Sequence, residues 1–498
     1  MSEDLPAEVR VLVVGAGFGG LAAAAHLRAA GYRSADDVLL IEQADEVGGT
    51  WRDNTYPECA CDVPSVLYSF SFAPNPGWTR SYGRQPEIQE YLVRTARQTG
   101  LIEQIRFGCA LIGASWDAAT SQWVAETSRG VIRAQVLVTA TGALSAPRLP
   151  DLPGLESFTG DAFHSARWDH GVSLAGKRVG VVGTGASAVQ FVPAIAPSVG
   201  HLTVFQRTPG WVIPRGDRAY VAGEKALFRR WPVTQKISRG ACYTYREGYV
   251  IGMAHAPSLL PAIQLVAEAH LRRQVPDPEL RAKLRPPFQL GCKRALLSND
   301  WFPALQRPNV ELVTSAAAEV TPHGVVDATG RKHELDVLIF GTGFTPTEPP
   351  VARLLTGRDG RTLAETWDGS PRAHHGLTVH GFPNLFLMYG PNTNLGHSSI
   401  VYMLESQARY VVDAVRTLDR ANLASLEVRA DVEHASVADV QRRLEHSVWN
   451  KGGCASWYLD RNGRNSVMWP TFTWRYRQAT RRLDVDSYHL KAVPVHAL

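Results

Sequence analysis

A glycine-rich turn near the start of the chain has the spacing that binds the pyrophosphate of a dinucleotide. Gly15, Gly17 and Gly20 follow an apolar strand and open a helix, and Glu42 closes the next strand. Gly15 permits the tight turn, Gly17 lets the backbone approach the phosphates, and Gly20 allows close packing of the helix. The helix start offers free N–H groups to the phosphates, and Glu42 can accept hydrogen bonds from ribose hydroxyls. Together these parts predict a complete βαβ dinucleotide site.

A second turn of the same kind predicts a second dinucleotide site. Its candidate binding residues are Gly183, Thr184, Gly185, Ala186, Ser187, Ala188 and Gln190, with alanine in the third glycine place. After the next strand the chain carries Arg207 and Thr208, where an acidic residue would bind a free 2′-hydroxyl. A cation and a hydroxyl suit a 2′-phosphate, and Lys293 is a plausible second cation, so we expect NADPH rather than NADH. The alternative for Arg207 is an ordinary exposed arginine.

The order of apolar segments predicts an α/β fold with two Rossmann-like, dinucleotide-binding domains. The strands are expected at 9–14, 37–41, 136–140, 178–182, 201–205 and 336–340. Because the strand at 336–340 resembles a return to the first domain, we expect the second domain to be inserted in the first. The predicted limits are 1–146 and 335–498 for the first domain and 147–334 for the second. Residues from about 217 to 290 lack a strand pattern and predict a helical subdomain within the second domain.

The composition is ordinary for a globular protein, and 498 residues suffice for two or three domains. A net charge of +5 without a block of cations gives no indication of nucleic-acid binding. No run of 18 apolar residues is present and Met1 to Glu8 is polar, so we expect a cytoplasmic protein without a membrane partner. Six scattered cysteines suggest reduced thiols, and no metal site is expected.

Between the two turns, Phe158, Gly160, His164 and Trp168 form the pattern FxGxxxHxxxW, followed by Asp169. This run resembles the signature of type I flavin-dependent Baeyer–Villiger monooxygenases, in the flavin-containing monooxygenase superfamily. Four further segments resemble that family in the same order: the loop from Gly49 to Asp62, Phe205 to Pro209, Gly291 to Arg294, and Ser456 to Tyr458. The resemblance covers nearly the whole chain. It places His164 and Trp168 at the hinge between the two nucleotide domains.

The resemblance implies FAD in the first site, NADPH in the second, and conversion of ketones to esters or lactones through a C4a-peroxyflavin. It assigns FAD contacts to Gly49, Thr50, Trp51, Asp62 and Tyr68. It also makes Arg294 the catalytic cation, because an arginine keeps its charge beside the peroxide and beside the oxyanion of the adduct. Asp62 would pair with Arg294 and hold it. Without the resemblance, Asp62 reads as a cap and Arg294 as a surface salt-bridge residue.

Other protein classes share parts of this pattern. Disulfide reductases need a CxxxxC pair, whereas Cys59 and Cys61 are closer together and too late in the chain, so we expect both to be buried structural residues. An N- or S-oxidising flavin-containing monooxygenase would use the same cofactors, but Trp168 favours the Baeyer–Villiger group. A nucleotide-sensing protein without turnover is a third possibility. The expected partners are O₂ and a small ketone or sulfide; the sequence leaves open the oligomeric state and whether Trp457 and Tyr458 line a pocket or a core.

Overall fold

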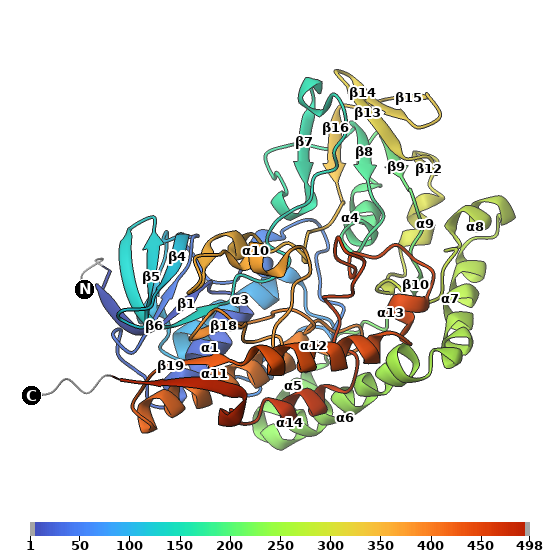
Figure 1. The fold of residues 1–498 in the computed structure, drawn as a ribbon. Helices are drawn as coiled ribbons and strands as arrows, with labels where there is room; N and C mark the ends of the chain where they lie inside the picture. The colour runs from blue at the N-terminus through green and yellow to red at the C-terminus, as the bar shows by residue number, and fades with distance from the viewer. Residues whose placement is uncertain (1–4, 494–498) are drawn as a thin grey trace, which may run out of the picture.

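Two separate sheets carry the two nucleotide turns (Figure 1). The structure is a computed structural model that describes residues 5–493, so the polar segment from Met1 to Glu8 lies partly outside it. The strands are β1 (Glu8–Val14), β2 (Val38–Ile41), β3 (Ile105–Arg106), β4 (Leu111–Asp117), β5 (Gln122–Thr127), β6 (Gly130–Thr139), β7 (Asp161–His164), β8 (Arg178–Val182), β9 (His201–Phe205), β10 (Val212–Ile213), β11 (Leu296–Leu297), β12 (Val310–Val313), β13 (Ala317–Thr321), β14 (Gly324–Asp327), β15 (Lys332–Glu334), β16 (Val337–Phe340), β17 (Leu355–Thr356), β18 (Leu385–Leu387), β19 (Leu423–Val428) and β20 (Tyr488–Ala492).

Helices cover both sheets and form a long arm on one side of the molecule. They are α1 (Phe18–Ala29), α2 (Thr50–Asp53), α3 (Gln85–Gln98), α4 (Ala188–Ile195), α5 (Ala222–Arg230), α6 (Pro232–Val250), α7 (Leu260–Gln274), α8 (Pro278–Leu284), α9 (Trp301–Leu305), α10 (Leu363–Trp367), α11 (Ile400–Arg420), α12 (Ala430–Leu444), α13 (Val448–Lys451) and α14 (Thr473–Ala479). In Figure 1 the first sheet lies at the left, the second at the upper right, and α6 and α7 run along the lower right.

The first sheet has the strand order β17-β4-β5-β6-β1-β2-β3, with β18 added beside β6. Its central strand β1 pairs in parallel with β2 and β6. Val11 and Val13 belong to the core under α1 and α11, whereas Leu12 and Val14 belong to a second core on the opposite face. Burial on both faces explains why this strand is apolar at every position from Val11 to Val14 instead of alternating.

The second sheet is parallel, with the order β12-β9-β8-β16-β7. The strand β16 was expected to return to the first domain at residue 335, and for this strand the expectation was wrong. It pairs with β8 and β7, and Val337 and Ile339 pack in the same core as α4. A buried apolar strand has the same sequence pattern in either sheet. Only the strand pairing in the folded protein shows which sheet it joins.

The segment from 217 to 290 is helical, as predicted. It contains α5 to α8 and a π-helix at Ile251–His255, and no strand is assigned within it. Hydrogen bonds attach it to the first domain: Gln235 donates to the Asn75 carbonyl at 2.7 Å and Arg239 to the Val66 carbonyl at 2.8 Å. Among residues 5–493, no single helix is long and apolar enough to cross a membrane. We call α5 to α8 the helical insert.

The expectation that all cysteines are reduced was wrong for two of the six. Cys292 and Cys454 form a disulfide with a Cα–Cα distance of 6.1 Å across a sequence separation of 162. Folding brings the two thiols together, and spacing along the chain gives no sign of it. Cys59, Cys61, Cys109 and Cys242 are free, and Cys59 and Cys61 are buried as expected. The disulfide ties the segment before Lys293 and Arg294 to the C-terminal loop.

A thiol titration tests this disulfide. Unfolded protein without reductant should expose the four free thiols, and reductant should raise the number to all six cysteines. The variant Cys454→Ser should gain one thiol before reduction, because Cys292 then lacks its partner. Six reactive thiols in unreduced wild-type protein would contradict the bond.

Candidate active site

The first glycine turn forms a cradle that side chains would fill. Gly15 has φ +101°, and a Cβ there would lie 2.7 Å from the Ala140 carbonyl oxygen. A Cβ on Gly20 would lie 1.8 Å from the carbonyl oxygen of Gly15, so the turn tolerates no larger residue at either place. The buried Glu42 carboxylate accepts from the Ala16 N–H at 2.8 Å and from Arg52 at 3.0 Å. Arg52, which the sequence did not single out, thus fixes the predicted ribose acceptor.

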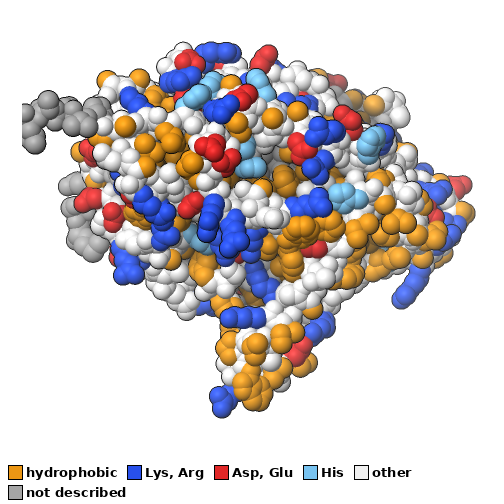
Figure 2. Space-filling model, turned by 60° about the horizontal axis from the view of Figure 1, so that its bottom comes forward, with side chains coloured by type: hydrophobic (Ala, Val, Ile, Leu, Met, Phe, Trp, Pro, Cys, Tyr) orange, Lys and Arg blue, Asp and Glu red, His pale blue; other side chains and the backbone are white. Residues whose placement is uncertain are grey.

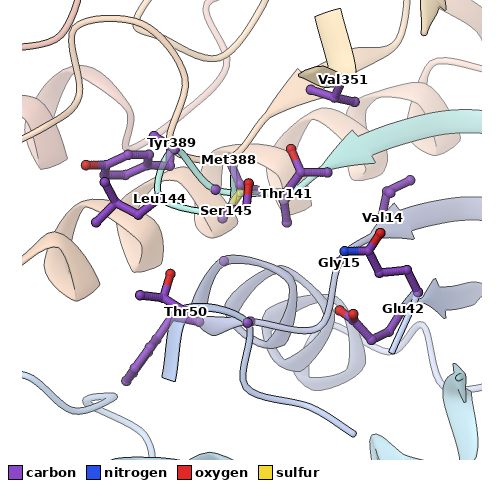
Figure 3. A pocket seen from close by; sticks show the side chains of 18 of the residues that line it. Val14, Gly15, Glu42, Thr50, Thr141, Leu144, Ser145, Val351, Met388 and Tyr389 are labelled. Carbon is purple, nitrogen blue, oxygen red and sulfur yellow. The ribbon is translucent and has the colours of Figure 1, made fainter. Parts of the chain in front are cut away.

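A cavity of about 370 Å³ opens beside this turn (Figure 3). Predicted contact residues line it: Gly15, Gly17, Glu42, Gly49, Thr50, Trp51 and Tyr68. Trp51 donates its indole N–H to the Tyr68 hydroxyl at 3.0 Å, and the two rings pack edge to face. The sequence did not predict Tyr389, which lines the same cavity in a left-handed conformation with φ +60°. This backbone conformation is unfavourable for any residue other than glycine, and residues held in it often occur at binding sites.

The second turn has the same geometry as the first and follows β8, the middle strand of the second sheet. Gly183 has φ +109°, and a Cβ there would approach the Gly341 carbonyl oxygen to 2.5 Å. Gln190 does not extend freely toward a ligand. Its amide bonds the Tyr56 hydroxyl at 3.2 Å and the backbone of Ala60 at 3.1 Å, so it joins α4 to the first domain.

The predicted 2′-phosphate residues bring two cations together. Arg207 is exposed, Thr208 is half-buried, and Lys293 lies with its ammonium 5.1 Å from the centre of the Phe288 ring. Burial and the charge of Arg207 lower the pKa of Lys293. Neither cation makes a salt bridge to any residue between 5 and 493. An anion bound between them would therefore relieve their mutual repulsion.

Asp62 and Arg294 meet across the interface between the first domain and the segment after the helical insert. Arg294 donates through Nη2 to Asp62 Oδ1 at 2.7 Å, through Nε to Oδ2, and through Nη1 to the Leu395 carbonyl at 3.2 Å. Burial alone would raise the pKa of Asp62, but the Arg294 charge outweighs it and lowers that pKa. About 29% of the Arg294 side chain stays exposed. A guanidinium has five N–H groups, so two remain available to a ligand.

Tyr389 and Asn394 connect this ion pair to the cavity. The Tyr389 hydroxyl donates to Asn394 Oδ1 at 2.8 Å, and the next residue supplies the carbonyl that Arg294 contacts. Tyr458 is buried in a core cluster, and burial raises its pKa to about 12 despite the nearby charge of Arg294. Trp457 is 40% exposed. The two residues therefore separate, with Tyr458 in a core beside Arg294 and Trp457 at the surface.

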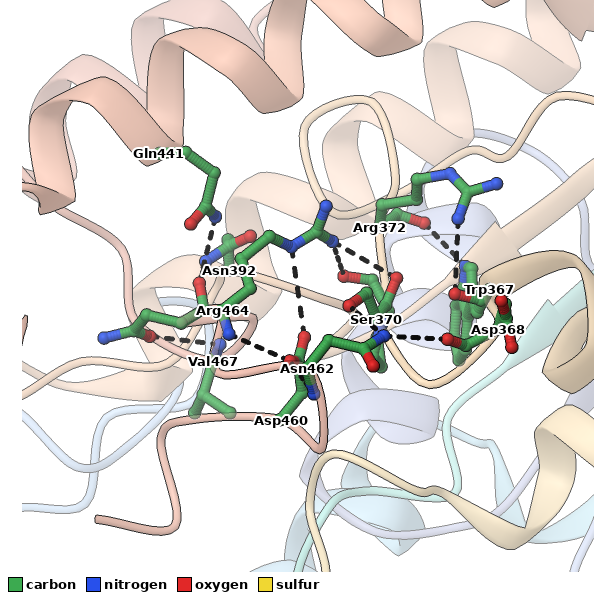
Figure 4. Close-up of polar contacts among 12 residues, drawn as sticks. Trp367, Asp368, Ser370, Arg372, Asn392, Gln441, Asp460, Asn462, Arg464 and Val467 are labelled. Carbon is green, nitrogen blue, oxygen red and sulfur yellow. Dashed lines mark hydrogen bonds and ion pairs between the residues drawn. The ribbon is translucent and has the colours of Figure 1, made fainter. Parts of the chain in front are cut away.

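Polar contacts hold the chain that follows Tyr458 against the first domain (Figure 4). Arg464 donates to the Pro371 carbonyl at 2.7 Å, and Asn462 donates to the Asp368 carbonyl at 2.9 Å. Asn392 donates to the Asn465 carbonyl at 2.8 Å. This segment thereby also supports the loop that carries Asn394 and Leu395.

Behind the ion pair lies a buried polar group that the sequence did not predict. Glu247 of α6 accepts from the Thr473 N–H and hydroxyl, both at 2.8 Å, and lies 3.5 Å from His397 Nε2. His397 is 1% exposed, and burial lowers its pKa although Glu247 opposes this. The adjacent Arg246 donates to the Asp62 carbonyl at 3.2 Å.

The signature run lies between the second sheet and the connector to the first. His164 ends β7, accepts from the Ala166 N–H at 3.0 Å and packs on Phe344. Burial lowers the pKa of His164 to about 4, so the ring is neutral near pH 7. Trp168 packs on Phe191 of α4 with ring centroids 5.2 Å apart. Both side chains thus pack against the second domain or its connector, and the hinge role stays a prediction.

The fold and the site define a class of protein. The site has three parts: two dinucleotide turns on separate sheets, a cavity at the first turn, and a partly exposed guanidinium held by Asp62. These are the parts of a flavoprotein oxidoreductase with two nucleotide sites. Residues 8–231 match the model of the flavin-binding monooxygenase-like family.

Relatives identify the group within that class. The chain is 47% identical over 502 residues to a Baeyer–Villiger monooxygenase of Pseudomonas aeruginosa, covering 100% of this chain and 95% of the relative. It is 48% identical to another from Streptomyces coelicolor, covering 98% and 94%. The crystal structure of cyclohexanone monooxygenase from Rhodococcus sp. Phi1 bound to NADP⁺ superposes with a TM-score of 0.87 at 30% identity, covering 98% of this chain and 100% of that one. The chain belongs to the Baeyer–Villiger group of the flavin-binding monooxygenases.

The middle glycines of the two turns allow the sites to be tested separately. Gly17 has φ −83°, and a Cβ there would have its nearest neighbour at 3.7 Å; the corresponding distance at Gly185 is 3.9 Å. Alanine at either place should therefore fold, but its methyl group would occupy the space that a pyrophosphate needs. We expect Gly17→Ala to be purified without flavin absorbance and Gly185→Ala to retain it but bind NADPH at least tenfold more weakly.

Each variant is the control for the other. Flavin absorbance and NADPH titration are the measurements, with thermal unfolding to confirm that both variants fold. Loss of flavin from Gly185→Ala with full retention in Gly17→Ala would reverse the assignment of the two sites.

Proposed function

We propose that this protein is an FAD- and NADPH-dependent monooxygenase that inserts one atom of O₂ beside the carbonyl of a small ketone, giving an ester or lactone. The partly exposed Arg294, held by Asp62 between the two nucleotide turns, is the observation that carries the proposal. We place FAD at the turn from Gly15 to Gly20 and NADPH at the turn from Gly183 to Ala188. We also propose a cytoplasmic location and no nucleic-acid partner.

The residues of the first site suit FAD. The cradle between Gly15 and Gly20 excludes side chains, the Glu42 carboxylate is held in place, and the cavity continues to Thr50, Trp51 and Tyr68. Bound FAD would supply the redox chemistry, taking a hydride from NADPH and activating O₂. The first domain would comprise residues 1–146 and the chain after β16. Residues 147 to 340 would form the NADPH domain, with the helical insert inside it.

Arg294 is proposed to act on the ketone. When an oxygen nucleophile adds to the carbonyl, negative charge develops on the ketone oxygen, and the two free N–H groups of Arg294 can stabilise that charge. Arginine keeps its proton throughout, so it also favours the anionic form of a nearby oxygen nucleophile. Asp62 binds Nε and Nη2 and thereby leaves part of the guanidinium available to the substrate. Its lowered pKa keeps the carboxylate charged at neutral pH.

Substitution of Arg294 tests this role. Arg294→Ala should lower ester or lactone formation by roughly 100- to 1,000-fold, as expected for loss of an oxyanion-stabilising donor. Products from linear, cyclic and aryl ketones and from thioanisole are measured by gas chromatography. Arg331→Ala, which removes an exposed arginine paired with Glu311, is the matched control and should keep full activity. Sulfoxide as the sole product, unchanged in Arg294→Ala, would move the protein to the heteroatom-oxidising group.

The choice of nicotinamide cofactor can be tested at Arg207 and Lys293. Removing either cation should raise the KM for NADPH by about 10- to 100-fold, the effect of losing one charge-assisted hydrogen bond. The KM for NADH should stay the same, because NADH lacks the 2′-phosphate, so NADH is the internal control. Equal loss with both cofactors would mean that these cations do not contact the 2′-phosphate.

A further inference from the structure

Exposed apolar side chains are concentrated on the helical insert. Eleven of the twenty-one large apolar residues that are exposed in the structure lie between residues 221 and 266, a segment of less than a tenth of the chain. We call this set the insert face; it consists of Val221, Leu227, Trp231, Val233, Ile237, Tyr245, Ile251, Leu259, Ile263, Leu265 and Val266. Single exposed apolar residues are normal, but a contiguous patch marks an interaction surface.

The insert face follows the helical repeat. Along α6 the exposed residues Val233, Ile237 and Tyr245 are separated by multiples of four positions, with the exposed Ala241 between them. Ile237 is 66% exposed and Tyr245 is 67% exposed. Residues four apart lie on one side of a helix, so they form a stripe. The helices Pro232–His255 and Pro257–Gln274 meet at 109°, and neither of them is long and apolar enough to cross a membrane.

The charges around this surface have one sign. Between residues 221 and 266 the acidic residues are Glu224 and Glu247. Glu224 pairs with Arg218 at 2.7 Å, and Glu247 is buried against Thr473. The neighbouring cations Lys225, Arg229, Arg230 and Lys236 make no salt bridge to any residue from 5 to 493. The insert face is thus bordered by cations without counter-charges.

Figure 2 shows where this surface lies. Orange apolar side chains gather on the projection at the bottom of the view and along the lower right, with blue Lys and Arg side chains at the edges. By position in Figure 1 these are α5, α6 and α7. An apolar surface that projects from the molecule can be buried by a partner that surrounds it on several sides.

A second copy of the chain suits this surface poorly. In a twofold dimer the same patch faces itself, so the unpaired cations of one copy would approach those of the other. A bilayer with anionic headgroups instead accepts the apolar stripe in its interfacial layer and the cations at its phosphates. Trp231 and Tyr245 have amphipathic rings of the kind enriched at that layer.

We propose that the helical insert docks on the surface of an anionic lipid bilayer, with the insert face buried in the interfacial layer and Lys225, Arg229, Arg230 and Lys236 at the headgroups. The proposal differs from the expectation, drawn from the sequence, that no membrane is a partner. The attachment is peripheral and independent of the reaction proposed above.

Vesicle co-sedimentation of the full-length, FAD-loaded protein tests the proposal. The probes are vesicles of phosphatidylcholine alone and of phosphatidylcholine with phosphatidylglycerol. Wild-type protein should sediment with the anionic vesicles and not with the neutral ones. The double variant Trp231→Ser with Ile237→Ser should lower the partition coefficient by roughly tenfold or more, because it removes apolar area from the interfacial layer. Arg229→Glu with Arg230→Glu should also lower the partition coefficient by roughly tenfold or more, because it replaces two cations at the headgroups by anions.

Matched controls separate the insert face from general surface effects. Ile112→Ser with Val131→Ser changes two apolar residues of equal 55% exposure on the first sheet, and should bind vesicles like wild type. Lys332→Glu changes an exposed cation on β15 and should do the same. Flavin absorbance and thermal unfolding confirm that each variant folds.

Three results would overturn the proposal. Wild-type protein could fail to bind anionic vesicles. The insert-face variants could bind as well as the controls. Sedimentation velocity could show a dimer that Trp231→Ser with Ile237→Ser dissociates, in which case the surface joins two copies of the chain.

Discussion

The ion pair between Asp62 and Arg294 is the contact on which the site depends, because its partners come from parts of the chain that only folding joins. Asp62 lies in the loop beside the first nucleotide turn, and Arg294 follows the helical insert of the second domain. A carboxylate facing a guanidinium through two hydrogen bonds fixes both position and direction. The contacts that hold either partner, such as the Leu395 carbonyl beside Arg294 and Arg246 beside Asp62, therefore act on the placement of one cation.

Secondary structure and turns were predictable where interactions between residues close in the sequence determine them. The strands β8 and β9 have the expected bounds, and the glycines of both turns adopt the geometry that their spacing required. Long-range partners were not predictable. An apolar strand such as β16 has no residue that indicates which sheet it joins, and Cys292 has no residue nearby that indicates Cys454. Glu247 and His397 make contact although they are 150 positions apart in the sequence (397 − 247). Asp62 and Arg294 were identified through family resemblance, since spacing alone gave no reason to pair them.

The helix α6 has one side that contacts the protein and one side that is exposed to solvent. Its inner side turns Gln235, Arg239 and Glu247 toward the first domain and the region behind the ion pair, where every one of them is hydrogen-bonded. Its outer side carries an apolar stripe and the unpaired cation Lys236. Periodicity of this kind is hidden from a search for continuous apolar runs, because the polar inner residues interrupt each run. The same interruption makes the helix two-sided in the folded protein.

The chain passes between the two sheets through connectors that are paired with each other. The Arg148 N–H donates to the Gly343 carbonyl at 2.8 Å, and Pro147 and Phe344 form an isolated β-bridge. A single connector could rotate freely about its backbone dihedral angles. Two connectors that are hydrogen-bonded to each other resist such rotation and bend more easily than they twist. The two sheets are therefore joined at this point by a paired ribbon and not by one connector, which limits twisting of one sheet relative to the other.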